Sequence, residues 1–257
     1  MGWRQNSERR TDMSTSTLGI IGTGPVGAGV ARRAVDAGLA VVLSNSRGPE
    51  TLTDLVASLG ANARAATPAE VARTTEVILA AVPFAVHERL SRAELDGKIV
   101  IDPMNYVVTE EWRRPELDRD ELTSSELVQR HLSGSKVVKA FHSIGSPQIN
   151  QLHRARGAAD RTALPLHGDD PVARKEVAGL LDALGFDAVD LGPLAGSWRT
   201  EPGTPLYASP YVGAPPAELT PAEWVAWVQA APGVPLSAAR LEELAAATVR
   251  GPAGFRW

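Results

Sequence analysis

Short apolar runs recur along the first 145 residues, separated by stretches whose apolar positions follow helical spacing. The runs at 77–82 and 98–101 have the length of a strand that is buried on both faces. The runs lie at 18–21, 39–43, 61–65, 77–82, 98–101 and 136–141. Helices are predicted between them, at 26–37, 49–59, 68–73 and 121–132. Strands that alternate with helices in this way predict an α/β fold with a doubly wound, mostly parallel sheet.

The pattern changes in the next part of the chain. A strand is predicted over 163–167, and Asp170 followed by Pro171 marks the start of a helix. A further strand over 186–190 completes a second βαβ-like unit. The segment 192–216 is rich in proline and glycine, which predicts loop.

We therefore expect four parts in the chain. These are a disordered leader at 1–17, a doubly wound domain at 18–145, a small C-terminal α/β domain at 146–216 and a helical extension at 217–257. In the extension, Trp224 and Trp227 lie three residues apart and would share one side of a short helix. We expect them to pack on the core or on a second subunit rather than to stack on a cofactor, and a homodimer follows from this expectation.

Composition excludes several classes of function. Cysteine is absent, so there is no disulfide framework, iron–sulfur cluster or thiol nucleophile. The net charge of −4 without a basic block predicts no nucleic-acid partner. No apolar run is long enough for a membrane span, and the polar start of the chain carries no secretory signal, so a cytoplasmic protein is expected. Asp169 and Asp170 are explained by helix capping, and no metal site is predicted.

One motif carries a specific chemistry. The segment Gly22-Thr23-Gly24-Pro25-Val26-Gly27 fits G-x-G-x-x-G, follows a predicted strand and opens a predicted helix. Gly22 would permit the tight turn, Gly24 would let the backbone approach a pyrophosphate, and Gly27 would let the helix pack closely on the sheet. The free amides of the helix N-terminus would bind the anion. These features predict a Rossmann domain that binds a dinucleotide.

The end of the second strand indicates which dinucleotide is bound. An NAD site would place Asp or Glu there for the ribose 2′-hydroxyl, whereas this chain has Asn45, Ser46 and Arg47. Neutral hydrogen-bonding groups beside a guanidinium suit a 2′-phosphate, which an acidic residue would repel. We therefore expect NADP(H), the alternative being a solvated polar turn with Arg47 facing water.

These residues resemble the NADP-dependent oxidoreductases of coenzyme F420, an 8-hydroxy-5-deazaflavin. More distantly, the chain is similar to the reductase domains of membrane ferrireductases and to pyrroline-carboxylate reductases. The resemblance covers about residues 18–211 and depends on the glycine motif, Val82-Pro83-Phe84 and the segment 136–144. Three later segments add to it: Gly168-Asp169-Asp170, Asp190 to Leu194, and Glu201 through Thr204-Pro205-Leu206.

The resemblance implies that nicotinamide lies in a cleft between two domains, with the deazaflavin ring against it. Val82 and Pro83 would flank the nicotinamide. The pocket of the other ring would be lined by Met104, Asn105, His142, Ser143, Thr204, Pro205 and Leu206. Hydride would pass directly between nicotinamide C4 and deazaflavin C5, which needs no general acid. This chain departs from the family pattern in placing Arg47 one position late and in continuing through 217–257.

Two other functions fit the same residues. An NADPH-dependent reductase of a small imine or carbonyl compound would need a proton donor, and His142 lies at the carboxyl end of a predicted strand, where such sheets bind ligands. His142 is equally well read as a structural residue or a pocket wall. A non-catalytic NADP(H)-sensing module would need no second pocket. The remaining histidines are expected to be structural: His87, His131, His153 and His167.

Overall fold

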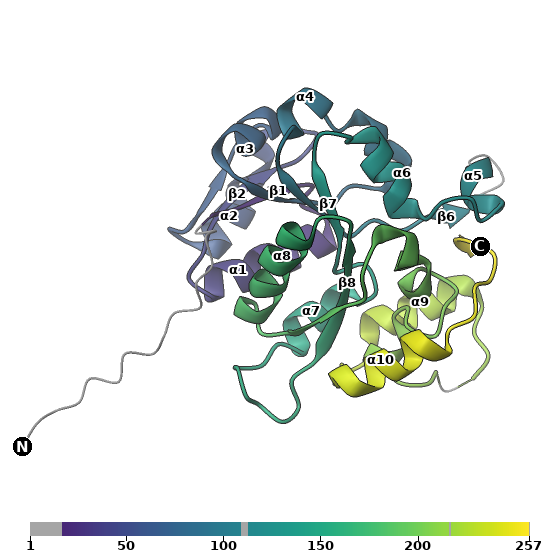
Figure 1. The fold of residues 1–257 in the computed structure, drawn as a ribbon. Coiled ribbons are helices and arrows are strands. Elements are labelled where there is room, and N and C mark those ends of the chain that lie inside the picture. Colours follow the sequence, from purple (N-terminus) through teal and green to yellow (C-terminus); the bar gives the residue numbers. More distant parts are fainter. Residues whose placement is uncertain (1–16, 109–112, 216, 257) are drawn as a thin grey trace, which may run out of the picture.

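Eight strands form one sheet in a computed structural model that describes residues 17–108, 113–215 and 217–256 (Figure 1). The order across the sheet is β3-β2-β1-β4-β5-β7-β8-β9. The strands are β1 (Thr17–Ile21), β2 (Ala40–Ser44), β3 (Ala63–Ala65), β4 (Val77–Ala80), β5 (Ile99–Asp102), β7 (Lys136–Lys139), β8 (Ala163–Gly168) and β9 (Asp187–Asp190). All neighbouring strands are parallel except β7 and β8. The predicted doubly wound, mostly parallel α/β fold is confirmed.

Strand β1 lies where the strand order reverses. It pairs with β2 on one side and with β4 on the other. The chain forms β2 and β3 on one side of β1 and then crosses back to form β4 and the later strands on the other side. Leu18 and Ile20 on this strand are fully buried, as a central strand requires. In open α/β sheets the ligand crevice forms at this reversal, outside the carboxyl ends of the strands.

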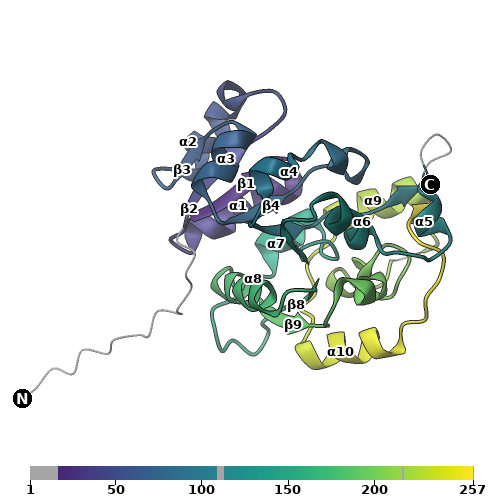
Figure 2. The same ribbon diagram turned by 45° about the horizontal axis from the view of Figure 1, so that its top comes forward.

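Helices cover both faces of the sheet (Figures 1 and 2). One face packs against α1 (Pro25–Asp36), α2 (Thr53–Leu59), α7 (Ser146–Gln151) and α8 (Pro171–Ala183). Helix α10 (Ala238–Ala247) contacts β8 and β9. The other face packs against α3 (Pro68–Thr74), α4 (Arg92–Leu95), α5 (Pro115–Asp118) and α6 (Ser124–His131). Asp170 caps α8 by accepting a hydrogen bond from the amide of Ala173 at 2.8 Å, as its sequence position predicted.

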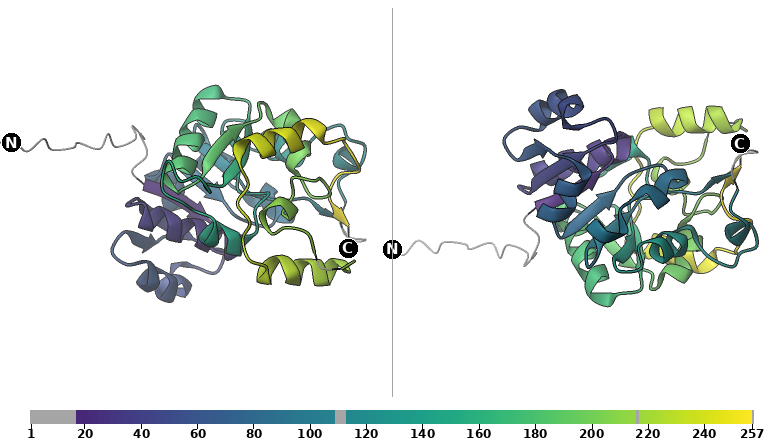
Figure 3. Two further views of the ribbon diagram at one scale, coloured as in Figure 1. Left: turned by 90° about the horizontal axis from the view of Figure 1, so that it is seen from below. Right: turned by 90° about the horizontal axis from the view of Figure 1, so that it is seen from above.

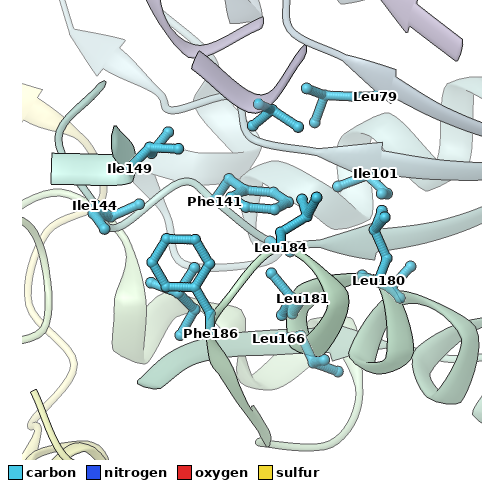
Figure 4. Packing of buried hydrophobic residues seen from close by; sticks show 14 of the residues in the cluster. Leu79, Ile101, Phe141, Ile144, Ile149, Leu166, Leu180, Leu181, Leu184 and Phe186 are labelled. Carbon is cyan, nitrogen blue, oxygen red and sulfur yellow. The ribbon is translucent and has the colours of Figure 1, made fainter. Parts of the chain in front are cut away.

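The larger apolar cluster joins the two halves of the sheet (Figure 4). Leu79 and Ile101 from β4 and β5 pack in the same cluster as Leu180 from α8 and Leu184 at its C-cap, and Phe141 lies beside Leu184. Strands β8 and β9 therefore extend the first sheet and share its core. The domain boundaries proposed from the sequence stay a prediction.

Several segments differ from the sequence prediction. The expected loop 192–216 contains two 3₁₀ turns, η3 (Leu194–Thr200) and η4 (Ser209–Tyr211). Helix α7 was not predicted, nor were η2 (Phe84–Arg89), α4 and the small pair of β6 (Val107–Val108) with β10 (Phe255–Arg256). The helix expected from Pro49 begins as a 3₁₀ turn, η1 (Pro49–Leu52), before α2.

The two ends of the sequence differ in what the structure describes. The leader predicted at 1–17 lies outside the described residues except for Thr17, which begins β1. In the extension, the short helix predicted around Trp224 and Trp227 forms as α9 (Pro221–Ala230), and α10 follows it (Figure 3). Among the helices described, none combines the length and apolar character that a membrane span requires.

Candidate active site

The glycine motif forms the turn between β1 and α1, and each glycine has a different steric reason. Gly22 has a φ of +98°, and a Cβ built on it would lie 2.2 Å from the carbonyl oxygen of Ala81. A Cβ on Gly27 would lie 2.0 Å from the carbonyl oxygen of Gly22. A Cβ on Gly24 would meet nothing within 4 Å, because this residue faces open space. The first two glycines therefore shape the turn, and Gly24 leaves room for a ligand.

A cleft of about 580 Å³ opens beside this turn. Its lining includes Gly22, Thr23, Gly24, Asn45, Ser46, Arg47, Ala81, Val82 and Pro83. Helix α1 begins at the cleft with Pro25 and has no acidic residue in its first turn. The amides of Val26 and Gly27 have no acceptor within the helix, so they and the helix dipole favour an anion here. The residues present thus fit the pyrophosphate of a dinucleotide.

The polar side chains that follow β2 have two different roles. Asn45 Oδ1 accepts hydrogen bonds from the amides of Arg47 and Gly48 at 2.9 and 3.0 Å, and its Nδ2 donates to Thr51 at 2.8 Å. The Asn45 side chain therefore holds the turn. Ser46 and Arg47 are exposed at the cleft, and Arg47 forms no ion pair with any described residue.

Sequence reasoning missed two charged residues of this cleft. Arg89 from η2 and Glu94 from α4 both line it and are both exposed. No motif marks either position. Their place at the cleft follows from the 3₁₀ turn after β4, which the sequence analysis did not predict.

A second pocket of about 300 Å³ adjoins the first. Gly24 lines the first cleft, and the next residue, Pro25, lines the second pocket, so the two spaces meet at the start of α1. The second pocket is lined by Pro25, Val26, Pro103, Asn105, Phe141, His142, Ser143, Tyr207, Trp224, Val225 and Val228, among others. It draws residues from five separate stretches of the chain.

Of the seven residues expected around the deazaflavin ring, three line the second pocket and four do not. Asn105, His142 and Ser143 line the second pocket. Met104, Pro205 and Leu206 do not line it, and Leu206 is fully buried in the core. Thr204 lines a different, smaller crevice with Trp198 and Arg250. The next two residues after this segment, Tyr207 and Ala208, line the pocket instead.

His142 lies at a strained turn that follows β7. Phe141 has a φ of +62°, which is rare for a bulky residue, and this turn sends the phenyl ring into the core while His142 lines the pocket (Figure 4). His142 Nε2 lies 2.7 Å from Thr200 Oγ1, and that hydroxyl donates to the carbonyl of Ser197 at 2.9 Å. Because a hydroxyl has one proton, Thr200 accepts from His142, whose Nε2 must carry the hydrogen.

The resulting tautomer of His142 has a chemical consequence. Nδ1 is left as a lone-pair acceptor, and this buried atom has no hydrogen-bond partner among the described residues. Burial holds the pKa of His142 well below its ordinary value, and the nearby Lys139 ammonium and His167 lower it further. His142 is thus neutral at pH 7, and its unpartnered Nδ1 is buried beside the pocket. An imidazolium proton for donation is not available.

A buried charge cluster supports the turn that carries His142. Lys139 is fully buried, and its Nζ donates to the Met104 carbonyl and to Ser124 Oγ, both at 3.0 Å. The carboxylates of Asp102 and Glu201 lie 3.8 and 3.9 Å from Nζ. The cluster ties together the ends of β5, β7 and η3, three segments that are far apart in the sequence. These contacts position the pocket wall rather than entering the pocket.

The other four histidines bond inside the protein. His87, His131 and His153 each have a ring nitrogen within 3.0 Å of a backbone carbonyl oxygen. His167 is fully buried, lies 3.4 Å from Thr200 Oγ1, and has a pKa lowered to about 3, chiefly by burial. None of the four lines either site pocket. Among the described residues, no group of three or more His, Asp or Glu could hold a metal ion.

The fold and the two adjoining pockets define a dinucleotide-binding oxidoreductase. The family model described as NADP oxidoreductase, coenzyme F420-dependent, matches residues 17–106. A hypothetical protein from Sinorhizobium meliloti is 31% identical, with a TM-score of 0.67, and the match covers 76% of this chain and 94% of that one. The chain belongs to the family of F420-dependent NADP oxidoreductases, as the sequence resemblance predicted, and is thereby an NADP-dependent oxidoreductase.

Two further structures agree at lower similarity. A candidate F420-dependent NADP reductase from Arthrobacter sp. FB24 is 27% identical, with a TM-score of 0.59, over 70% of this chain and 86% of that one. A reductive aminase from Aspergillus terreus is 18% identical, with a TM-score of 0.51, over 72% of this chain and 57% of that one, and shares the fold alone. No curated protein matches the sequence.

Proposed function

We propose that this protein transfers a hydride between NADP(H) and a deazaflavin coenzyme, F420, by direct ring-to-ring transfer. The observation that carries the proposal is the junction of the two pockets, where Gly24 lines one and Pro25 lines the other. A ligand that runs along the first cleft would reach the second pocket at this junction. Family membership supports the choice of the two coenzymes.

NADP(H) would be held mainly by backbone groups and one exposed guanidinium. The turn around Gly22, Thr23 and Gly24 and the amides at the start of α1 would bind the pyrophosphate. Ser46 and Arg47 would bind the 2′-phosphate through charge-assisted hydrogen bonds, with Asn45 shaping their turn. Val82 and Pro83 line the cleft and would flank the nicotinamide. When bound, the nicotinamide supplies or accepts the hydride at C4.

The chain's own contribution to the transfer would be to align two rings and to exclude water. Reduction of the deazaflavin by NADPH consumes one proton, which its ring nitrogen can take from solvent. The neutral state of His142 agrees with a reaction that needs no protein acid. Reduction of an imine or carbonyl compound would need such a donor, and this residue does not provide one.

The proposal is tested by mixing the protein with NADPH and oxidised F420 and following the loss of the visible absorbance of the deazaflavin. We expect catalytic turnover that requires both coenzymes. NADPH binding without turnover would contradict the proposal and leave a sensing module or a different second substrate. The cytoplasmic location and the homodimer stay predictions, and a monomeric mass in analytical ultracentrifugation would contradict the second.

A further inference from the structure

Helix α9 forms one wall of the second pocket, although it lies beyond the family match at 17–106 and beyond the region of sequence resemblance. Trp224, Val225 and Val228 on this helix line the pocket, together with His142 and Pro25 from the first half of the chain. The pocket is therefore incomplete without the extension.

The position of α9 is fixed by a buried amide. Gln148 on α7 is fully buried, and its Nε2 donates to the carbonyls of Val228 and Ala231 at 3.1 and 2.9 Å. Val228 and Ala231 also pack in a small apolar cluster with Val212. At the other end, the Thr220 hydroxyl and the Glu223 carboxylate form a reciprocal capping box. The C-terminal end of α9 is thus held to α7 by two hydrogen bonds, and its N-terminal end is capped within the helix itself.

The wall that α9 supplies is aromatic. Trp224 stacks on Tyr207, with ring centroids 6.0 Å apart and an interplanar angle of 20°. Both rings line the pocket and both are only partly buried. A pocket with a flat aromatic wall is suited to a planar ring, because offset stacking gains energy beyond the area buried.

Two buried acceptors belong to residues that line the pocket. The His142 carbonyl binds Asn105 Nδ2 at 2.9 Å, which leaves Asn105 Oδ1 without a partner among the described residues. His142 Nδ1 is the second unpartnered acceptor. A ring that reached both atoms would have to carry N–H or O–H groups on its edge, as an imide or a phenol does.

We propose that Trp224 is a specificity-determining residue that forms the stacking face for the second substrate, and that α9 selects planar rings with hydrogen-bond donors on their edge. This inference rests on the proposed function, since it concerns the second pocket of the same reaction. It assigns to the extension a role in substrate choice.

The test compares two tryptophans on one helix. Trp224→Leu removes the aromatic wall, whereas Trp227→Leu is the matched control, because Trp227 packs against the same apolar cluster but does not line the pocket. Binding of oxidised F420 is measured by fluorescence anisotropy of the deazaflavin, without NADPH. We expect Trp224→Leu to raise the Kd about tenfold. We expect Trp227→Leu to change it less than twofold and Trp224→Phe to restore most of the affinity.

Each outcome separates this inference from the proposed function. NADPH affinity and the far-ultraviolet circular dichroism spectrum should match the wild type in all three variants, which excludes misfolding as the cause. Equal Kd values for wild type and Trp224→Leu, or equal losses of F420 affinity in both leucine variants, would overturn the inference. Turnover of NADPH and F420 by the wild type would still support the proposed function in that case. Deazaflavin binding that depends on Trp224 but gives no turnover would support the inference and contradict the proposed function. Absence of binding to the wild type would contradict both.

Discussion

The two pockets of this protein are built in different ways. The nucleotide cleft is formed by turns that follow β1, β2 and β4, and its critical positions are glycines and backbone amides. The second pocket is formed by side chains from five separate stretches that include α9, and its turn at Phe141 is supported by buried charges. The first site is local in the sequence, and the second exists only once the whole chain is folded.

This difference predicts how each pocket fails. Damage to the cleft should change nucleotide binding through short-range steric or charge effects. Damage to the buried charges behind the second pocket should appear first as lost stability, because those side chains connect distant segments. The four predictions below test this division, beginning with the largest expected effect.

The largest effect is expected from the buried ammonium. Replacing Lys139 by Met leaves the carboxylates of Asp102 and Glu201 buried without their cation, which should lower the free energy of unfolding by about 3–5 kcal/mol. Lys136→Met is the matched control on the same strand, since Lys136 is exposed and contributes about 0–1 kcal/mol through Asp170. Urea unfolding measures both. Equal losses would show that the buried cluster has no special role.

Two glycines of the cleft should separate folding from binding. Gly27→Ala places a methyl group 2.0 Å from the Gly22 carbonyl, so both the melting temperature and NADPH affinity should fall. Gly24→Ala adds a methyl group in open space at the cleft, so the melting temperature should be unchanged while NADPH affinity falls about tenfold. Calorimetry and NADPH titration measure the two quantities. An unchanged NADPH affinity in Gly24→Ala would mean that no ligand approaches this backbone.

The next prediction concerns the positive charge of Arg47, at the end of the cleft where the ribose 2′-phosphate would bind. Arg47→Ala should weaken NADPH binding about 10- to 100-fold and leave NADH binding unchanged, because the guanidinium would contact only the 2′-phosphate. Arg32→Ala, an exposed arginine on α1 outside the cleft, controls for the change in net charge. Titration with both nucleotides is the measurement. Similar losses for NADPH and NADH would remove Arg47 from the phosphate site.

The last effect is a pH dependence of the stability near the second pocket. His167 has a folded pKa of about 3 against an ordinary value of 6.5, so the unfolded chain binds the proton more readily. Its contribution to stability is complete above about pH 6.5 and falls by about 1.4 kcal/mol per pH unit below it. His142 should act in the same direction. Urea unfolding between pH 7 and 5 measures this dependence. The free energy of unfolding should fall less with decreasing pH in His167→Gln than in the wild type, and an equal fall in both proteins would contradict this assignment.

The fold and the nucleotide turn were predictable because their signals are local. Alternating apolar runs and helices define the sheet, and the glycine spacing defines the turn at Gly22. The role of Asn45 was less predictable. Its residue type suits phosphate binding, but its side chain holds the Arg47 amide instead, and only the geometry of the turn distinguishes these uses.

The second pocket could be predicted only in part. Asn105, His142 and Ser143 line it because they follow the ends of β5 and β7, where parallel sheets place their ligands. The 3₁₀ turns after residue 193 shift the chain so that Tyr207 lines the pocket in place of Thr204 to Leu206. Trp224 comes from a helix far along the sequence, and no periodicity places that helix beside this pocket.

The strained turn at Phe141 limits how this protein can diversify. Its positive φ favours glycine or asparagine, whereas the core around it requires a large ring, so few residues satisfy both demands. Neighbouring changes at His142 would also disturb the bond to Thr200. Helix α9 has exposed positions and a single aromatic contact to the pocket, so mutations there meet fewer obstacles. New substrate preferences should therefore arise in natural variants through α9, while the strand ends stay fixed.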